Sequence, residues 1–589
     1  MANNKHYTTE RNIQIVISLL KQHGIHRVIA SPGTTNMTFV GSIQNDPFFQ
    51  IWSSVDERSA AYLACGMASE TGEPVVLSCT GATASRNYMP GLTEAYYRKL
   101  PVLAITSHRG DYQIGHLLDQ QIDRRNIPND IAIQSVVVPM VKDATDEKYC
   151  IDNANKAILA LKENGGGPAH INMFTAYSQD FSVESFKSAR KISLVTPFEK
   201  GWPKLPKGRI AIFIGSHQPF SEETTIKIDK FCASHDAVVF CSHISGYHGK
   251  YAINFSLVNG QQNYSSPCNK IDLLIHLGEV SGNVYGNSGR ETWRISEDGQ
   301  IRDTFNNLTH VFQMPSEVFF AHYTDEEGNH TEYLNSCKDE LNKTTLLIPE
   351  LPFGNVWIAR QMIGKLPNGC ELHLGILNSL RSWSFFQLPQ GVEARCNVGG
   401  YGIDGGMSTM IGASLVRPDK LFFGVFGDLA FFYDMNVLGN REVGNNIRVM
   451  LINNGMGAEF RNYGHPCYSY GVEAEKFMAA AGHYGNKSPK LVKHYAEDLG
   501  YEYLTASDKD TFLKVMPKFL DSKIGNKPIL LEVFTDQQNE SDALETMLNL
   551  YKPSKEEIAK RKAKNAVKKV VKAVIGEKIV EKVKDTLKK

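Results

Sequence analysis

Asp428 stands in the middle of an apolar run, in the stretch FGDLAFFYDMNVLGN that begins at Phe426. An unpaired carboxylate buried in such a run is costly, so Asp428 needs a partner. The next apolar run, IRVMLINN, ends in Asn453 and Asn454, the latter 26 positions after Asp428. If the two runs are parallel strands, both polar positions lie at the carboxyl edge of a sheet, where ligands bind. Carboxylate, amide and carbonyl oxygens suit Mg²⁺ bound to a phosphate-bearing cofactor. The alternative is an ordinary turn Asp and turn Asn.

Other ionisable side chains fall at a helix start or in loops. Glu57 opens the helical pattern ERSAAYLACGMASETG. It is either a functional carboxyl or a helix-start glutamate favoured by the helix dipole. The remaining candidates for contact with an anionic substrate are loop residues that could equally be solvated: His108, Arg109, His116, Arg124, Arg461 and His465.

Alternating strands and helices must position these residues. The first region has an amphipathic helix over Asn12–Gly24, followed by apolar runs and helical patterns in turn: HRVIASPG, the Glu57 helix, PVVLSCT, a helix after TGATAS, and PVLAITS. This alternation predicts a parallel sheet covered by helices on both faces. The region closes near GGGPAHINMF.

Two further α/β regions follow. After a link rich in Pro and Lys, the middle region contains strands at RIAIFIGS, AVVFCS and DLLIHLGE; the last has CELHLG, LFFGVFGD, IRVMLINN and PILLEVFTD. We therefore predict an α/β chain of three doubly wound parallel-sheet domains, with the first and third similar in fold. The expected ranges are 1–190, 191–345 and 346–552, followed by a basic amphipathic helix over 553–589.

Composition indicates a soluble globular protein, with 42% apolar and 21% charged residues. No signal peptide or membrane-spanning run is visible, and ten scattered cysteines favour reduced thiols, so we expect a cytoplasmic location. The segment 553–589 carries thirteen Lys/Arg against five Asp/Glu, which leaves the body acidic. This tail could bind an anionic membrane surface, dock on the acidic body of a neighbouring chain, or remain a solvated appendage. An acidic body without aromatic stacking positions argues against nucleic acid.

GD at Gly427, an intervening helix and NN at Asn453 resemble the signature of thiamin diphosphate (ThDP)-dependent enzymes. The third residue, Leu429 in place of the commoner glycine, is similar to the 2-succinyl-5-enolpyruvyl-6-hydroxy-3-cyclohexene-1-carboxylate (SEPHCHC) synthase branch of menaquinone biosynthesis. Further matches run along the chain in order: SPG at Ser31, DERSAAYLACGMA at Asp56, TGATASRNYMPGLTEA, GPAHIN at Gly167 and GIDGGMST at Gly402.

The resemblance implies roles for particular residues. Glu57 would hydrogen-bond the aminopyrimidine of ThDP and promote loss of the thiazolium C2 proton. Ile403 would support the bent form of the cofactor. Ser408 and Thr409 would lie near the cofactor or cap a helix. The PYR and PP names of the family would apply to the first and third domains.

The same resemblance implies the metal and diphosphate sites. Asp428 and Asn454 would bind Mg²⁺ through their side chains, and Met456 through its backbone carbonyl. Gly427 and Leu429 would approach the diphosphate with their backbone.

The substrate positions of the SEPHCHC branch are altered. Thr34 and Thr35 follow SPG where the branch has Ser and Arg, and Val398 replaces an arginine that helps hold the distal carboxylate of 2-oxoglutarate. Arg381 lies in a shortened segment, NSLRSW, whereas Gln120 matches the branch. Loss of a bidentate carboxylate partner leaves an anionic tail poorly matched.

We therefore expect a ThDP- and Mg²⁺-dependent lyase or transferase. It would decarboxylate a 2-oxo acid, with a pyruvate-like donor favoured, and transfer the acyl unit to an aldehyde, ketone or sugar, in surface-polysaccharide synthesis if the tail binds membranes. The alternatives are SEPHCHC synthesis from 2-oxoglutarate and isochorismate, simple 2-oxo acid decarboxylation, and a non-catalytic scaffold. The family implies a homodimer, or a dimer of dimers forming a homotetramer, with active sites between chains.

Overall fold

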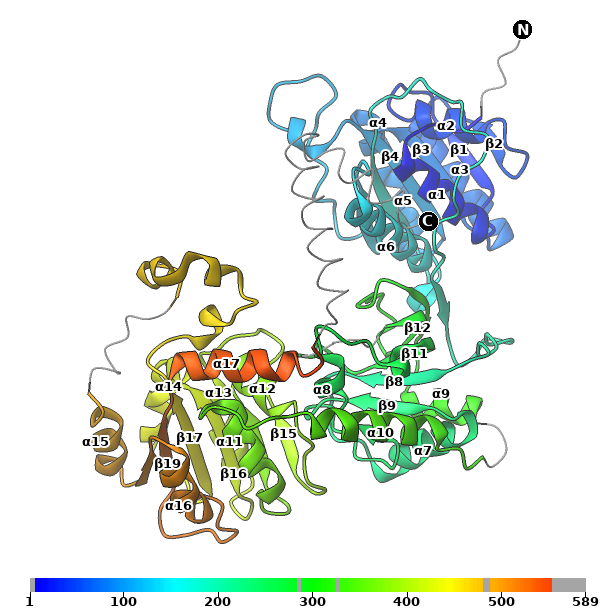
Figure 1. Cartoon of the computed structure of the whole chain (residues 1–589). Coiled ribbons are helices and arrows are strands. Elements are labelled where there is room, and N and C mark those ends of the chain that lie inside the picture. Colours follow the sequence, from blue (N-terminus) through cyan, green and yellow to red (C-terminus); the bar gives the residue numbers. More distant parts are fainter. Residues whose placement is uncertain (1–5, 283–287, 325–327, 480–487, 553–589) are drawn as a thin grey trace. The chain divides into compact units, whose positions relative to one another are not determined.

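Parallel strands and covering helices alternate along the chain (Figure 1). The computed structural model describes residues 6–282, 288–324, 328–479 and 488–552. They divide into two compact units: unit 1 comprises 1–204 and 291–319, and unit 2 comprises 205–290 and 320–589. The basic helix predicted for 553–589 lies outside the described residues. None of the helices in the described ranges is long and apolar enough to cross a membrane.

Unit 1 contains a sheet of six parallel strands, the first sheet, in the order β2-β1-β3-β4-β6-β5. The strands are β1 (Arg27–Ala30), β2 (Gln50–Ser53), β3 (Val75–Thr80), β4 (Val102–His108), β5 (Gln134–Val138) and β6 (Ala169–Phe174). The helices between them are α1 (Arg11–Gln22), α2 (Met37–Ile43), α3 (Glu57–Thr71), α4 (Thr83–Asn87), α5 (Met89–Tyr97) and α6 (Ala144–Ala160).

Two apolar cores cover the two faces of the first sheet. Along β3, Val76 packs into the core that includes α1 and α6, whereas Val75 and Leu77 face the core that includes α3 and α5. Burial on both faces explains why this strand is a continuous apolar run in the sequence. The predicted doubly wound arrangement is confirmed here.

The strands of the middle region are divided between the units. Unit 2 begins with four parallel strands in the order β10-β9-β8-β11, namely β8 (Ile210–Ile214), β9 (Val238–Cys241), β10 (Ala252–Ile253) and β11 (Ile271–Leu277). These confirm the three strands predicted for the middle region. Unit 1 holds the parallel strands β7 (Ser193–Val195) and β13 (Leu308–Phe312) and most of β12 (Gly289–Ile295). The helices of the middle region are α7 (Glu222–His235), α8 (Ser256–Asn259), α9 (Ser316–Tyr323) and α10 (Glu332–Leu346).

The third sheet lies in unit 2 and has the order β15-β14-β16-β17-β19-β18 (Figure 1). Its strands are β14 (Glu371–Leu374), β15 (Glu393–Arg395), β16 (Phe422–Gly427), β17 (Ile447–Asn453), β18 (Glu502–Ala506) and β19 (Ile529–Phe534). Its helices are α11 (Asn355–Met362), α12 (Asn378–Trp383), α13 (Gly406–Leu415), α14 (Asp428–Asp434), α15 (Leu491–Asp498), α16 (Lys509–Phe519) and α17 (Gln537–Leu548). Numbered within each region, the first and third sheets have the same strand order, which confirms the predicted similarity.

Candidate active site

Asp428 lies at the junction of a strand and a helix. The apolar stretch around it is not one strand: β16 ends at Gly427 and α14 begins with Asp428. β16 pairs with β14 on one side and β17 on the other. The strand order reverses between β14 and β16, so the crevice expected for a ligand lies at the carboxyl end of β16.

Asp428 is 2% exposed and links two loops. Its Oδ1 accepts a hydrogen bond from the Leu429 amide, and its Oδ2 accepts one from the Gly455 amide, both at 2.8 Å. Gly455 has φ +84°, a left-handed conformation that favours glycine. The loop after β17 is thereby held against the start of α14.

Asn454 and Met456 stand on that second loop. Asn454 is half-buried, and its Oδ1 accepts a hydrogen bond from the Met456 amide at 3.3 Å. Among the described residues, no atom lies within 4 Å of the place where a Cβ on Gly427 would stand, so another group can approach this backbone closely. A carboxylate, an amide oxygen and a backbone carbonyl on two tethered loops form a hard-oxygen donor set, which fits Mg²⁺ bound to a diphosphate.

Buried acids lie behind this edge of the sheet. Burial is the main cause that raises the pKa of Glu540 to about 7, and the negative charge of Asp428 also raises it. Glu540 accepts hydrogen bonds from the Asn355 amide at 2.9 Å and the Thr535 hydroxyl at 2.8 Å. Burial also raises the pKa of Glu532, which accepts a hydrogen bond from the Asn453 side chain at 2.7 Å. These acids were not singled out from the sequence, because their burial depends on the folded sheet.

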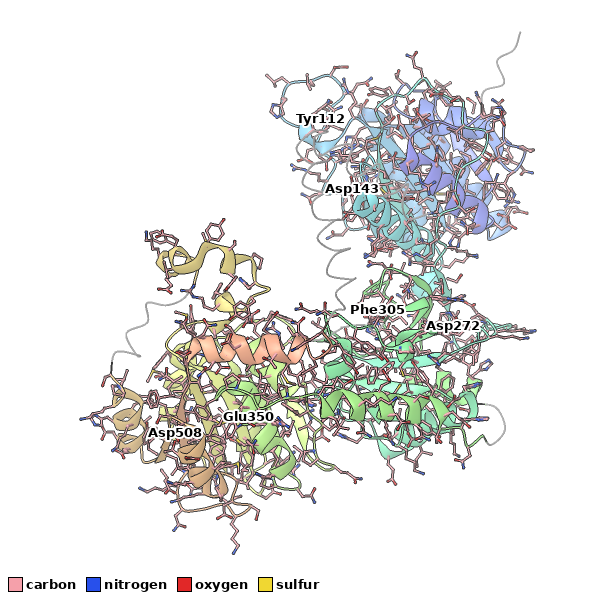
Figure 2. All side chains as sticks on the ribbon, in the orientation of Figure 1. Tyr112, Asp143, Asp272, Phe305, Glu350 and Asp508 are labelled. Carbon is pink, nitrogen blue, oxygen red and sulfur yellow. The ribbon has the colours of Figure 1, made fainter. Side chains whose placement is uncertain are left out.

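Glu57 occupies the first turn of α3 in unit 1. Asp56 caps this helix by accepting from the Arg58 amide at 3.0 Å. Asp143 and Asp508 cap α6 and α16 in the same way (Figure 2). The Glu57 carboxylate is half-buried and accepts a hydrogen bond from Asn87 at 3.2 Å.

Two neutral residues of the segment after β3, Asn87 and Tyr88, lie close to the Glu57 carboxylate. Tyr88 is fully buried, and burial, with smaller contributions from Cys79 and Glu57, raises the pKa of its hydroxyl well above the usual value. Asn87 was not singled out by sequence, although it lies in the TGATASRN segment that carries the resemblance. Glu57 therefore has a neutral hydrogen-bond donor and remains accessible to a ligand.

The threonines after SPG differ in orientation. Thr35 is 2% exposed, and its hydroxyl donates to the Ser107 carbonyl at 2.5 Å. Thr34 is exposed, so it is the one of the two that a substrate can reach. Gln120 lies in the exposed loop after β4 and has φ +58°.

Two of the predicted substrate residues around the end of β4, Arg109 and Arg124, have partners within the chain, and His108, the last residue of β4, is buried. Burial lowers the pKa of His108 to about 3, and its ring lies 3.6 Å from Asp111. Arg109 pairs with Asp119 at 3.2 Å, and His116 is exposed. Arg124 is 5% exposed and donates to Thr106 at 2.5 Å and to Asn172 at 2.6 Å.

The predicted substrate residues of unit 2 also have internal contacts. Val398 is 4% exposed and lies against Gly282, where an added Cβ would stand 3.4 Å from its Cγ1. Arg381 forms a bidentate ion pair with Glu459, and Arg461 pairs with Glu475. His465 caps the 3₁₀ segment Pro466–Lys476 by accepting from the Cys467 amide at 3.1 Å.

Of the three residues predicted near the cofactor, Ile403 precedes α13 and Ser408 and Thr409 lie in its first turn. Ile403 is half-buried in the loop before this helix. Ser408 donates its amide to Asp434 at 2.7 Å, and its hydroxyl bonds the same carboxylate. Thr409 donates to the Gly405 carbonyl at 2.9 Å. Ser408 and Thr409 thus fasten the start of α13.

Comparisons with known proteins agree along the chain. Residues 12–127 match the model of the thiamine pyrophosphate enzyme N-terminal TPP binding domain. A SEPHCHC synthase of Phocaeicola vulgatus is 29% identical over 583 residues, covering 91% of this chain and 98% of the relative. One of Bacteroides thetaiotaomicron is 29% identical over 564 residues with the same coverage, and one of Flavobacterium psychrophilum is 28% identical, covering 89% and 95%.

Proposed function

Because this enzyme belongs to the thiamin diphosphate-dependent superfamily and is similar to SEPHCHC synthases over most of its length, we propose that it catalyses a reaction of the SEPHCHC synthase type. The donor would be 2-oxoglutarate and the acceptor isochorismate, with release of CO₂. The succinyl group in the relatives' name is what remains of 2-oxoglutarate after that loss. The near full-length likeness to relatives of this name carries the proposal, and it favours this reaction over the pyruvate-like donor that we preferred from the sequence.

Some residues of the chain would bind the cofactor, and Glu57 would assist proton transfer. Asp428, Asn454 and the Met456 carbonyl would hold Mg²⁺, with Gly427 and Leu429 beside the diphosphate. Bound ThDP supplies the carbon nucleophile and accommodates the electrons left by decarboxylation. Glu57 would hydrogen-bond the cofactor's aminopyrimidine and keep it in the tautomer that accepts a proton.

The decisive experiment measures CO₂ release and product mass. With ThDP, Mg²⁺, 2-oxoglutarate and isochorismate, we expect CO₂ release that depends on both cofactors and a product of the mass of SEPHCHC. CO₂ release from a 2-oxo acid without this product would reject the acceptor. Absence of cofactor-dependent CO₂ release from a panel of 2-oxo acids would reject the decarboxylation itself.

A second candidate is the same chemistry with a smaller donor whose tail carries no charge, such as pyruvate. Val398 supports it, because a buried apolar side chain stands where the resemblance places a carboxylate-binding arginine. The donor panel separates the candidates: a higher kcat/KM for pyruvate than for 2-oxoglutarate favours the second.

We further propose that the active form is at least a dimer. Large apolar side chains near Glu57 are exposed in the single chain: Trp52 at 41%, Val55 at 80%, Tyr62 at 48% and Leu63 at 50%. A second copy covering them would remove this surface from water and dry the surroundings of Glu57. Light scattering during gel filtration should give twice the chain mass or more; a monomer that retains full activity would contradict the proposal.

A further inference from the structure

Arg381 and Glu459 form a well-defined ion pair in unit 2. Arg381 lies on α12, and Glu459 lies in the 3₁₀ segment Ala458–Arg461. Nη1 of Arg381 donates to one carboxylate oxygen at 2.8 Å, and Nη2 donates to the other at 3.1 Å. This parallel arrangement is the geometry by which arginine recognises carboxylates.

Two asparagines hold the pair in place. Asn378 accepts from Arg381 Nη1 at 3.2 Å. Asn462, which is 7% exposed, donates to Asn378 at 3.2 Å and to Glu459 at 3.0 Å. The orientation of the guanidinium is thus fixed by three side chains from two segments, those of Asn378, Glu459 and Asn462.

The pair belongs to the edge of the sheet that carries Asp428. α12 follows β14, the parallel neighbour of β16, and Glu459 lies five residues beyond Asn454. An added Cβ on Gly457 would stand 3.1 Å from the Leu429 side chain, so the loop leading to Glu459 packs on the residue after Asp428. The side chains of Arg381 and Glu459 are 22% and 20% exposed, which leaves them within reach of a ligand at this edge.

Glu459 occupies the position that a substrate carboxylate would take on Arg381. We propose that Glu459 is a specificity-determining residue, which satisfies Arg381 from within the chain and selects substrates whose tail beside α12 carries no negative charge. A second carboxylate brought to Arg381 must displace Glu459 or lie against its charge. The inference rests on the proposed decarboxylation and favours its second candidate, a donor such as pyruvate, because it concerns the charge of the tail that the same site accepts.

The proposed role of Glu459 is tested by a substitution that removes its charge and keeps its shape. In Glu459→Gln, we expect kcat/KM for 2-oxoglutarate relative to pyruvate to rise at least ~10-fold, mainly through a lower KM for 2-oxoglutarate. Glutarate, which cannot be decarboxylated as a 2-oxo acid, serves as a probe independent of activity. Its Kd, measured by calorimetry, should fall about 10-fold in this variant, about 1.4 kcal/mol of binding free energy.

Controls separate specificity from loop structure. Glu473→Gln removes an exposed carboxylate that pairs with Lys476 in the same region, and we expect it to change neither the donor ratio nor the glutarate Kd. The double variant Arg381→Gln/Glu459→Gln should show neither the higher donor ratio nor the tighter glutarate binding of Glu459→Gln. Arg381→Gln alone should weaken glutarate binding. Circular dichroism checks that each variant folds, and Glu459→Ala provides a second test of the freed arginine.

The outcomes are distinct from those of the proposed function. Unchanged donor ratio and glutarate affinity in folded Glu459→Gln would overturn the inference while leaving the decarboxylation intact. A gain that persists without Arg381 would also overturn it. If no donor releases CO₂, the proposed function fails, and the glutarate affinities still decide whether Glu459 blocks Arg381.

Discussion

The first and third sheets have the same strand order, but burial shifts the pKa of two histidines near the first sheet and of two glutamates near the third. Near the first sheet, burial lowers the pKa values of His108 and His170 to about 3. Near the third, burial raises the pKa of Glu532 and takes that of Glu540 to about 7. In both places burial disfavours the charged form, which keeps these two histidines neutral and weakens these two acids.

This difference separates what topology fixes from what side chains fix. The shared strand order places a crevice at the same point in each region, beyond the strands that are first and third in the chain. The side chains at that point then assign its chemistry. The first region offers Glu57 on the helix before β3, whereas the third places Asp428 directly after β16.

The largest expected effect comes from Glu57→Gln, which tests proton handling in the first region. We expect turnover to fall about 100- to 10,000-fold, the range typical of a lost acid–base group. ThDP affinity, measured by calorimetry, should change little because the proposed metal ligands remain. Glu70→Gln, an exposed change near the other end of α3, is the matched control and should retain activity. Full turnover in Glu57→Gln would remove Glu57 from the mechanism.

Asp428→Asn tests the third region by binding rather than by turnover. Loss of the charged ligand should weaken Mg²⁺-dependent ThDP binding about 10- to 100-fold. Activity should recover in part at high concentrations of ThDP and Mg²⁺. Asp419→Asn, a change at an exposed carboxylate before β16, should bind ThDP normally. Equal ThDP affinity in both variants would contradict the assigned metal site.

Acid should lower the stability of the fold through His170, which lies in the first sheet. Its ring is hydrogen-bonded to Thr106 at 2.8 Å and Ser135 at 2.9 Å, and its pKa of about 3 compares with 6.5 when unfolded. Below pH 6.5 the unfolded chain takes up a proton that the folded chain does not, so stability falls as pH falls. Between pH 6.5 and 5 this residue should account for about 2 kcal/mol of that loss. Urea unfolding of His170→Gln should show a shallower decline over this interval; an unchanged slope would exclude His170 as its source.

Rising pH should lower the stability of the fold through Glu540, near the third sheet, over a limited pH interval. Between pH 4.5 and 7 the unfolded chain releases a proton that folded Glu540 retains, so stability falls as pH rises. The loss should approach about 3 kcal/mol by pH 7 and then level off. Glu540→Gln keeps an acceptor for the Asn355 amide and should flatten this part of the stability curve. A wild-type slope in this variant would refute the assignment.

The sequence was sufficient to predict the inner strands of both sheets. β3, β4, β16, β17 and β19 are buried on both faces and are therefore apolar runs that stand out in any window. The edge strands β2 and β18 were not predicted. Gln50, Trp52 and Ser53 of β2 are exposed, so that strand lacks the apolar signal on which the others were recognised.

The sequence predicted where Asp428 and Asn454 lie along the strands better than it predicted contacts between distant segments. Asp428 and Asn454 stand at strand ends, and the structure confirms that geometry through the bond from Gly455 to Asp428. The partner of Arg381 lies 78 residues away at Glu459, and no local spacing connects them. One feature of the sequence could have indicated Glu459: it is the one acidic residue in the glycine-bearing loop that follows Asn454.

The Gly455–Asp428 hydrogen bond has a thermodynamic consequence. It fastens the segment that leads to Glu459 onto the carboxylate proposed to hold the cofactor's metal. We therefore expect metal binding at Asp428 to order this segment. Binding linkage is reciprocal, so any substrate that tightens under bound cofactor must tighten the cofactor by the same factor. We therefore expect discrimination between donors to appear in the concentration of ThDP that each donor requires.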